Sequence, residues 1–418
     1  MQLEIPASAL DILRNASAST SGSREQEQPE AEVVENDLDA FPELAWRGIF
    51  VDYREAMANA TEASDVFHFA ALWAGAAVSL GRRTWMFAGE QVFPNAYLLL
   101  FGETGDKKTT AQRMILNHNV LPANILVIRN LGSTEGLADA FKREDGADSV
   151  VLSFWEEVTS VFARGRWSGS TILEFITETF DCPPEWGLKY RKDPITIEKP
   201  TPTILSGTTL AWFWKNARAE DFHGGFGNRF GYLTGPKKAP NPNPTEPGGA
   251  ALQRVREALE RLSGIHPVQA RFSHAAIRLW DRFYIKWESD ARPGLYGAAT
   301  KRIHVYIRKL AMVYAALEET LPEITLDQLK ASIAVGVYMA ECARVLVEAQ
   351  HAAFRPEGQI EQRFLDWLKS HDGATRRTMQ QTLTKVAGSC DAFNRTLAAL
   401  VRSDLIEIRE NRVYLVTR

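Results

Sequence analysis

The chain has 418 residues and a formal net charge of -4 at pH 7. This length exceeds that of one ordinary hydrophobic core, so two or three domains are expected. Hydrophobic residues make up 45% and charged residues 24%, which excludes wholesale disorder and is typical of globular proteins. The nearly balanced charge also excludes a global positive field, so any contact with nucleic acid would have to be local.

Cysteine usage and hydropathy narrow the class of protein further. Cys182, Cys342 and Cys390 share no C-x-x-C spacing, so neither a zinc site nor a disulfide framework is indicated. Apolar runs are too short to span a bilayer, and the first residues lack the order of a secretory signal. We expect a cytoplasmic protein without a membrane partner.

The N-terminal 90 residues are predicted to form two segments. Residues 1–40 are expected to be a disordered acidic arm, because Ser17 to Asp39 contain almost no large apolar side chains. Residues 41–90 are expected to form a helical collar, because apolar residues recur there at helical spacing. These residues are Phe67, Phe69, Leu72, Trp73 and Val78.

Residues 91–236 contain short apolar runs that predict buried parallel strands separated by helices. The runs are residues 96–101, 149–154 and 203–207. The first run leads into the segment Gly102-Glu103-Thr104-Gly105-Asp106-Lys107-Lys108-Thr109-Thr110, which precedes a helical pattern. This order of strand, loop and helix predicts a phosphate-binding loop (P-loop) for ATP.

The P-loop prediction assigns a role to each part of that segment. Backbone N–H groups of the loop would surround the phosphates, Lys108 would reach the β and γ oxygens, and Thr109 would hold Mg²⁺. The glycine expected before the lysine is replaced by Lys107. The alternative interpretation is a flexible glycine turn between a strand and a helix.

Two glutamates follow the second apolar run, at the position of a Walker B motif. Glu156 would be a ligand of Mg²⁺ and Glu157 the catalytic base that polarises water. The alternative is that both glutamates cap a helix beginning near Thr159. Downstream, Arg164 and Arg166 with Trp167 would form a DNA-contacting pore loop, unless this segment is simply a solvated loop. Lys189, Arg191 and Lys192 raise the same possibility.

The third run ends at Thr208 and Thr209, where a sensor of the γ-phosphate would lie between the first two strands. We assign this role to Thr208, and a plain threonine-rich turn is the alternative. Arg229 follows a glycine-rich turn and is a candidate arginine finger acting on a neighbouring subunit. Otherwise Arg229 would be a surface residue paired with Asp221 or Glu220.

The remaining chain is predicted to form a linker and two domains. Residues 237–250 are rich in proline and indicate a linker or long surface loop. Residues 251–355 have a helical pattern and are expected to form an all-helical lid. Residues 356–418 predict three helices followed by a β-hairpin, which is the order of a winged helix.

The predicted winged helix carries basic residues where DNA contacts are expected. Arg395 and Arg402 would lie on the recognition helix, Arg376 and Arg377 at the start of the preceding helix, and Arg409 and Arg412 on the wing. Acidic residues dilute this patch, and winged helices also bind proteins, so protein contact is the alternative function of the domain.

The order of these motifs resembles the YfjI-like primase-helicase proteins of phages, plasmids and integrated elements. The resemblance spans about residues 45–317 and rests on six segments: Phe93-Pro94-Asn95, Gly102 to Thr110, Glu156-Glu157, Glu174-Phe175, Pro202 to Gly207 and Gly225 to Phe230. It implies an AAA+ or superfamily 3-like replication ATPase that forms a ring. Relatives carry a basic residue at the position of Lys309 in the lid helix, which we assign to the nucleotide site. They also carry non-glycine residues before the P-loop lysine. The chain shows no zinc finger or primase acid cluster, so priming activity is not implied.

Together the sequence predicts an α/β P-loop ATPase core, AAA+ or RecA-like, with an N-terminal helical collar, a C-terminal helical lid and a terminal winged-helix domain. The expected function is an ATP- and Mg²⁺-dependent helicase or translocase on single-stranded or forked DNA, in a mobile-element replication system. The expected assembly is a hexameric ring, with other replication proteins as further partners. The alternatives are an ATPase switch that loads a helicase or serves antiphage defence, and a non-catalytic DNA-binding adaptor.

Overall fold

The computed structural model describes most of the chain beyond residue 37. The described residues are 38–129, 136, 141, 150–155, 157–165, 170–188, 195–353, 359–387, 389–402, 405–409 and 411–416. They form two compact units, one ending at Leu346 and the other beginning at Val347. The acidic arm expected over residues 1–40 lies outside the described residues except for its last three.

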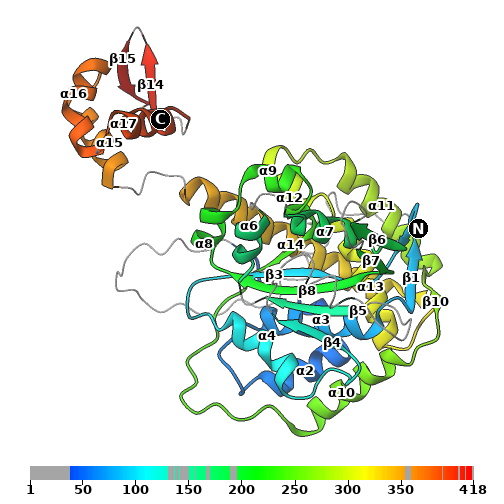
Figure 1. Cartoon of the computed structure of the whole chain (residues 1–418). Helices are drawn as coiled ribbons and strands as arrows, with labels where there is room; N and C mark the ends of the chain where they lie inside the picture. Colours follow the sequence, from blue (N-terminus) through cyan, green and yellow to red (C-terminus); the bar gives the residue numbers. More distant parts are fainter. Residues whose placement is uncertain are drawn as a thin grey trace, which may run out of the picture. The chain divides into compact units, whose positions relative to one another are not determined.

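A five-stranded, all-parallel sheet forms the centre of the first unit (Figure 1). The strand order is β4-β5-β8-β3-β9, so β8 lies between β3 and β5. The strands are β3 (Tyr97–Phe101), β4 (Leu126–Arg129), β5 (Val150–Trp155), β8 (Thr201–Thr208) and β9 (Gly231–Leu233). Every residue of β3 and β8 is buried, as expected for strands covered on both faces.

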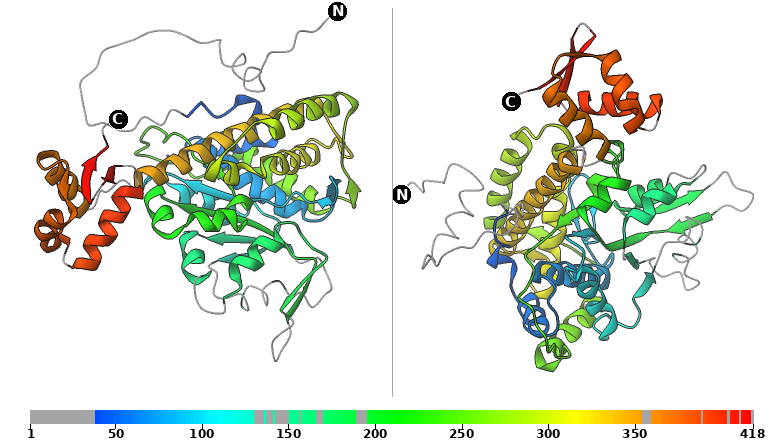
Figure 2. Two further views of the ribbon diagram at one scale, coloured as in Figure 1. Left: turned by 90° about the horizontal axis from the view of Figure 1, so that it is seen from above. Right: turned by 90° about the vertical axis from the view of Figure 1, so that its left-hand side faces the viewer.

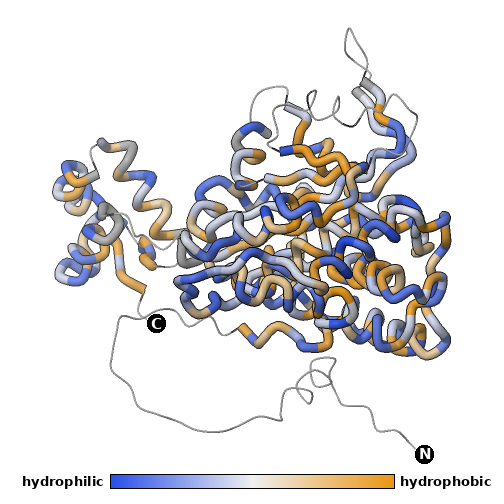
Figure 3. The backbone as a smooth tube through the Cα atoms, turned by 90° about the horizontal axis from the view of Figure 1, so that it is seen from below, coloured by the Kyte–Doolittle hydropathy of each residue, from blue (hydrophilic) through white to orange (hydrophobic). Residues whose placement is uncertain are grey.

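Helices cover both faces of this sheet (Figure 1). Helices α3 (Asp65–Leu80) and α4 (Lys108–Asn117) lie on one face, and α3 contacts β3, β5 and β8. On the other face lie α6 (Thr159–Gly165), α7 (Ile172–Thr179) and α8 (Leu210–Asn216). Helix α3 is buried on nearly its whole circumference, begins at a Ser64 cap and ends at Gly81, whose φ of +54° suits glycine. Figure 3 shows hydrophobic and hydrophilic stretches alternating along the backbone.

Residues 41–90, and residues 251–355 as far as Leu346, belong to the same compact unit as the sheet. Strand β1 (Thr84–Phe87) pairs with β2 (Gln91–Val92) and with the distant β10 (Val268–Gln269). Helix α10 (Gly249–Ser263) packs against α2 (Ile49–Met57) and α3. The lid is not all-helical, since β10 and the parallel pair β11 (Arg271–Phe272) and β12 (Glu323–Ile324) lie within it.

The proline-rich segment 237–250 is a surface segment that is attached to the unit and does not link separate domains. The backbone N–H of Lys238 donates to the Glu62 carbonyl, and that of Thr245 donates to the Asn59 carbonyl. The Lys238 ammonium also pairs with Asp65 at 2.6 Å. These contacts hold the segment against the loop between α2 and α3. Of the two predicted alternatives, a linker and a long surface loop, the structure has the long surface loop.

Helices α11 to α13, and α14 as far as Leu346, complete the first unit. They are α11 (His274–Ser289), α12 (Gly294–Thr300), α13 (Ile303–Leu317) and α14 (Leu326–Ala353). The long α14 runs beside α13, and a Cβ at Gly336 would lie 2.5 Å from Ile307, so glycine permits this close packing (Figure 2). The other elements are η1 (Glu43–Ala45), β6 (Glu185–Leu188), β7 (Ile195–Glu198), α9 (Ala219–His223) and η2 (Gly227–Arg229).

The second unit contains three helices followed by a hairpin, with one additional short strand. The elements are α15 (Gln359–Ser370), β13 (Ala374–Thr375), α16 (Arg376–Ala387), α17 (Cys390–Arg402), β14 (Ile406–Arg409) and β15 (Arg412–Leu415). Strand β15 pairs with both β13 and β14. Apolar residues from all three helices and the hairpin form its core. This element order is the one expected of a winged helix.

Candidate functional site

The predicted P-loop, Walker B and sensor segments all follow strands that end at the same edge of the sheet. Phe101, the last residue of β3, is in register with Thr208, the last residue of β8, and Ser206 of β8 is in register with Trp155 of β5. Ligands of open parallel sheets bind outside this carboxyl edge. The topology therefore brings together Lys108, Thr208 and Glu157, which are far apart in the sequence.

The loop between β3 and α4 is tightly turned. Gly105 has a φ of +96°, and Lys107 occupies the left-handed region with φ of 58°. A non-glycine residue in this region costs about 1–2 kcal/mol, which explains why glycine is expected at that position. Within the loop the Glu103 N–H donates to the Asp106 carboxylate at 2.6 Å.

The Lys108 ammonium closes the loop on itself. It donates to the carbonyl oxygens of Gly102 at 2.9 Å and Glu103 at 2.8 Å. Burial lowers the pKa of Lys108, and the nearby carboxylates of Asp106 and Glu157 act in the opposite direction. Glu157 is therefore close enough to Lys108 for its charge to act on the pKa of that lysine, although the two residues follow different strands.

The first turn of α4 presents backbone donors beside this lysine. Helix α4 begins at Lys108, and Thr109 and Thr110 lie half-buried in its first turn. The first N–H groups of a helix have no acceptor within the helix, and the helix dipole favours an anion there. This end of α4 therefore has the donors that a phosphate group requires.

Glu157 follows β5 at the carboxyl edge of the sheet and caps a helix, which is the role stated above as its alternative. Its Oε1 accepts from the Thr159 N–H at 3.3 Å and from the Thr159 hydroxyl at 3.1 Å, which caps α6. The Val158 N–H donates to the Gly207 carbonyl and joins the ends of β5 and β8. Glu156, the predicted ligand of Mg²⁺, lies outside the described residues.

The two threonines at the end of β8 have different roles. The Thr209 hydroxyl accepts from the Trp212 N–H and caps α8. Thr208 is buried beside the end of β3, and its hydroxyl donates to the Thr209 carbonyl at 3.2 Å. Thr208 is thus the threonine next to the loop that carries Lys108, in the position assigned to the sensor.

Arg229 lies at the opposite edge of the sheet from the P-loop, immediately before β9. Its guanidinium donates to the Gly225 carbonyl at 2.9 Å and lies 3.6 Å from the Asp181 carboxylate. Only 16% of the side chain is exposed. The predicted alternative partners Asp221 and Glu220 are therefore wrong, and Arg229 cannot reach the P-loop of its own chain.

Lys309 also lies at the amino-terminal edge, so its assignment to the nucleotide site of the same chain is wrong. Its ammonium donates to Asn95, which precedes β3, and stands 4.4 Å from the Phe180 ring centroid. The neighbouring Tyr306 hydroxyl binds the carbonyls of Tyr97 and Arg229. These contacts hold α13 at the amino-terminal ends of β3 and β9, whereas the P-loop follows the carboxyl end of β3.

The burial of Lys309 leads to a stability prediction. Burial lowers its pKa to about 8, so between pH 8 and 10.5 the unfolded chain binds more protons than the folded chain. Raising the pH through this window should therefore stabilise the wild type relative to Lys309→Met, by about 2 kcal/mol in total. Denaturant unfolding of both proteins at pH 7.5 and 10 measures this. A stability difference independent of pH would contradict the assigned titration.

The basic residues predicted to contact DNA lie in two places. Arg164 is the penultimate residue of α6, and its Nη1 is buried without a hydrogen-bond partner among the described residues. Arg164 is half-buried within α6, so it does not lie on a loop, and the prediction that it contacts DNA stays a prediction. Arg166, Trp167, Lys189, Arg191 and Lys192 lie outside the described residues.

In the second unit, Arg376, Arg377, Arg395, Arg409 and Arg412 are exposed. Arg376 donates to Asn394, Arg409 pairs with Glu407, and Arg412 donates to the Gly373 carbonyl. Arg377 and Arg395 extend from α16 and α17, the second and third helices of the unit. Arg402 is the last residue of α17, and its side chain is not among those that the structure describes.

The pairing of Arg229 and Arg302 with one carboxylate, Asp181, was not predicted from the sequence. Arg302 meets Asp181 at 2.7 Å across a separation of 121 residues, which no local pattern reveals.

In the described ranges, no group of three or more His, Cys, Asp or Glu residues could hold a metal ion. Helices long and apolar enough to cross a membrane are likewise not found there. Comparison with models of protein families and with curated proteins found no match.

Proposed function

We propose that the chain binds and hydrolyses ATP at the carboxyl edge of its sheet and uses this activity to move along DNA. The observation that carries the proposal is the strand register, which brings the loop with Lys108, the end of β8 with Thr208 and the end of β5 with Glu157 to one edge. A lysine, a helix N-terminus and a carboxylate at one edge are the groups that phosphoryl transfer requires.

The donors of the loop suit a triphosphate. Phosphate oxygens would replace the two carbonyl oxygens that Lys108 now binds, and charge-assisted hydrogen bonds to phosphate are stronger than those to a carbonyl. Thr109 and Glu156 would hold Mg²⁺, which neutralises phosphate charge when bound. Glu157 would orient the attacking water, and Thr208 would contact the γ-phosphate.

The same proposal extends to assembly and to DNA. Arg229 cannot serve its own P-loop, so a catalytic role for it requires a neighbouring subunit, as in a hexameric ring. The exposed arginines of the second unit support contact with single-stranded or forked DNA. A replicative helicase or translocase of a mobile element, working with other replication proteins, combines these roles.

Glu157→Gln should leave ATP binding intact and lower turnover by about a hundredfold. The glutamine carbonyl can still accept from Thr159 and preserve the α6 cap, whereas the charge that polarises water is lost. Thr159→Ala is the matched control, because it removes the hydroxyl partner but keeps the carboxylate. Steady-state ATP turnover compares them. Equal losses in both variants would show that Glu157 acts only as a cap.

Arg395→Ala should weaken binding to forked DNA and reduce the salt slope of log Kd by about one unit, since one phosphate contact is lost. Basal ATP turnover should be unchanged. Lys369→Ala, on the first helix of the same unit, is the control and should bind DNA as the wild type does. Fluorescence anisotropy over a salt series measures both. An unchanged slope for Arg395→Ala would assign this surface to protein contacts.

A nucleotide-dependent switch is the second candidate function. It is favoured by the use of Glu157 as a helix cap, which would slow hydrolysis more than binding. ATP turnover measured without DNA, with single-stranded DNA and with forked DNA separates the two. Stimulation by DNA with strand separation supports the motor, whereas slow, unstimulated turnover supports the switch.

A further inference from the structure

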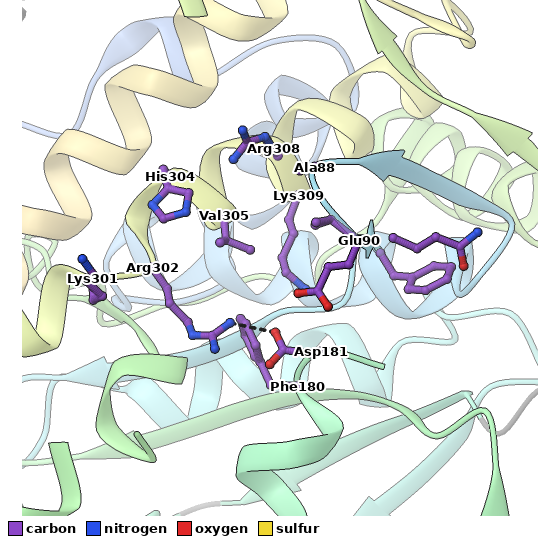
Figure 4. Close-up of a pocket in the computed structure, with 13 residues that line it drawn as sticks. Ala88, Glu90, Phe180, Asp181, Lys301, Arg302, His304, Val305, Arg308 and Lys309 are labelled. Carbon is purple, nitrogen blue, oxygen red and sulfur yellow. Dashed lines mark hydrogen bonds and ion pairs between the residues drawn. The ribbon is translucent and has the colours of Figure 1, made fainter. Parts of the chain in front are cut away.

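A cavity of about 290 Å³ opens near the amino-terminal edge of the sheet, remote from the P-loop (Figure 4). Its walls come from the start of α13, the segment after α7 and the β1–β2 hairpin. Figure 4 shows basic side chains of α13 on one side, with Phe180 and Asp181 opposite. Its charged lining residues are Lys301, Arg302, Arg308, Lys309, Glu90 and Asp181.

Positive charge exceeds negative charge in this cavity. Four cationic side chains and two carboxylates line it, but Arg302 pairs with Asp181 at 2.7 Å and Lys301 pairs at 3.9 Å with Glu288, outside the lining. His304 adds no charge at neutral pH, because burial lowers its pKa to about 4. Asp181 is already shared by Arg302 and Arg229. Within the described part of the chain, no carboxylate lies within 4 Å of the cationic groups of Lys309 and Arg308.

Lys309 is the most deeply buried of these cationic groups. Its side chain is 2% exposed, and its ammonium has three donors, of which one reaches Asn95. The guanidinium carbon of Arg308 lies 4.1 Å from the Trp280 ring centroid, a cation–π contact that does not neutralise its charge. Asp181 acts on Lys309 only from beyond ion-pair distance and is shared with Arg302 and Arg229, so this buried cation is poorly compensated and would favour an anion in the cavity.

We infer that this cavity binds a small phosphomonoester, such as a nucleoside or sugar monophosphate. Lys309 and Arg308 carry two positive charges outside these ion pairs, which matches a phosphate dianion, and their ammonium and guanidinium offer the several donors that phosphate oxygens accept. A volume of about 290 Å³ is at the lower end of the range for small-molecule sites and cannot enclose a duplex. The inference does not depend on the proposed ATPase function.

The test uses the full chain carrying Lys108→Ala, so that nucleotide binding at the P-loop does not interfere. Isothermal titration with adenosine 5′-monophosphate and ribose 5-phosphate should show one saturable site for at least one of them. Adding Lys309→Met should raise Kd about 10- to 100-fold, because a charge-assisted hydrogen bond is lost. Lys330→Met, an exposed lysine of α14, is the matched control and should leave Kd unchanged.

A second substitution, Glu90→Gln, should change Kd in the opposite direction. Glu90 is an exposed carboxylate of the β1–β2 hairpin that lines the cavity, so Glu90→Gln should lower Kd several-fold by removing repulsion. Because Glu90 is exposed, this variant still tests the site if Lys309→Met fails to fold, which a thermal melt would detect.

Three results would overturn the inference. The first is no binding of either ester to the Lys108→Ala protein. The second is binding that neither Lys309→Met nor Glu90→Gln changes. The third takes either of two forms: inorganic phosphate binds as tightly as both esters, or the substitutions change the Kd of a single-stranded oligonucleotide only. In both cases no phosphomonoester is recognised.

Discussion

Lys108→Ala is expected to abolish measurable ATP turnover, a loss of at least about a thousandfold, while the fold is preserved. The lysine binds only two carbonyls of its own loop, so its removal leaves no buried charge without a partner. Phosphate oxygens, in contrast, would lose their cationic partner. Nucleotide binding by fluorescence, turnover by phosphate release and thermal melting together measure this result.

Lys107 provides the control for this experiment. Lys107→Ala keeps a side chain in the same left-handed conformation and should be milder than Lys108→Ala. Lys107→Gly relieves the strain of that conformation and should retain turnover. If Lys107→Ala proves the more damaging change, Lys107 is the lysine that binds phosphate and the loop alignment is shifted by one residue.

Arg229→Ala is expected to lower turnover by about a thousandfold without changing nucleotide affinity, if Arg229 acts on a neighbouring subunit. In the isolated chain Arg229 and Arg302 share Asp181. Arg302 can therefore keep that carboxylate neutralised when Arg229 leaves it for another partner. Arg218→Ala, at an exposed arginine nearby, is the control and should be as active as the wild type.

Mixing experiments separate action between subunits from a local structural role. Assemblies that combine Arg229→Ala with Lys108→Ala subunits should recover part of the activity, because some interfaces then pair an intact loop with an intact arginine. Mixed assemblies that form but remain inactive would count against a shared site. A fully active monomer would eliminate the proposal.

The sheet was predictable where its strands are buried on both faces. The apolar runs of β3, β5 and β8 predicted those strands nearly to the residue. Strand β4 was not predicted, although Ile125 to Ile128 form an apolar run like those of the other strands. It lies at the edge of the sheet, where Leu126 is 39% exposed. The pairing of β1 with β10 was not foreseeable, since two-residue strands owe their existence to distant partners and not to local propensity.

The site was predictable only in part, for a related physical reason. A loop such as Gly102 to Thr110 is recognised locally, because strand, turn and helix are contiguous. Which edge of the sheet a distant helix approaches is set by tertiary packing. For this reason Lys309 was assigned to the wrong edge, and Asp181, which joins Arg229 and Arg302, gave no signal in the sequence.

The left-handed Lys107 has a kinetic consequence for ligand capture. A glycine at this position would exchange freely between positive and negative φ, so the loop could open and close around an incoming ligand with a low barrier. A lysine has a narrow left-handed well and loses that freedom. Entry and exit of a triphosphate would then both be slow compared with a glycine-containing loop. Lys107→Gly should accordingly increase association and dissociation rates together, and stopped-flow fluorescence would detect this even if Kd hardly changes.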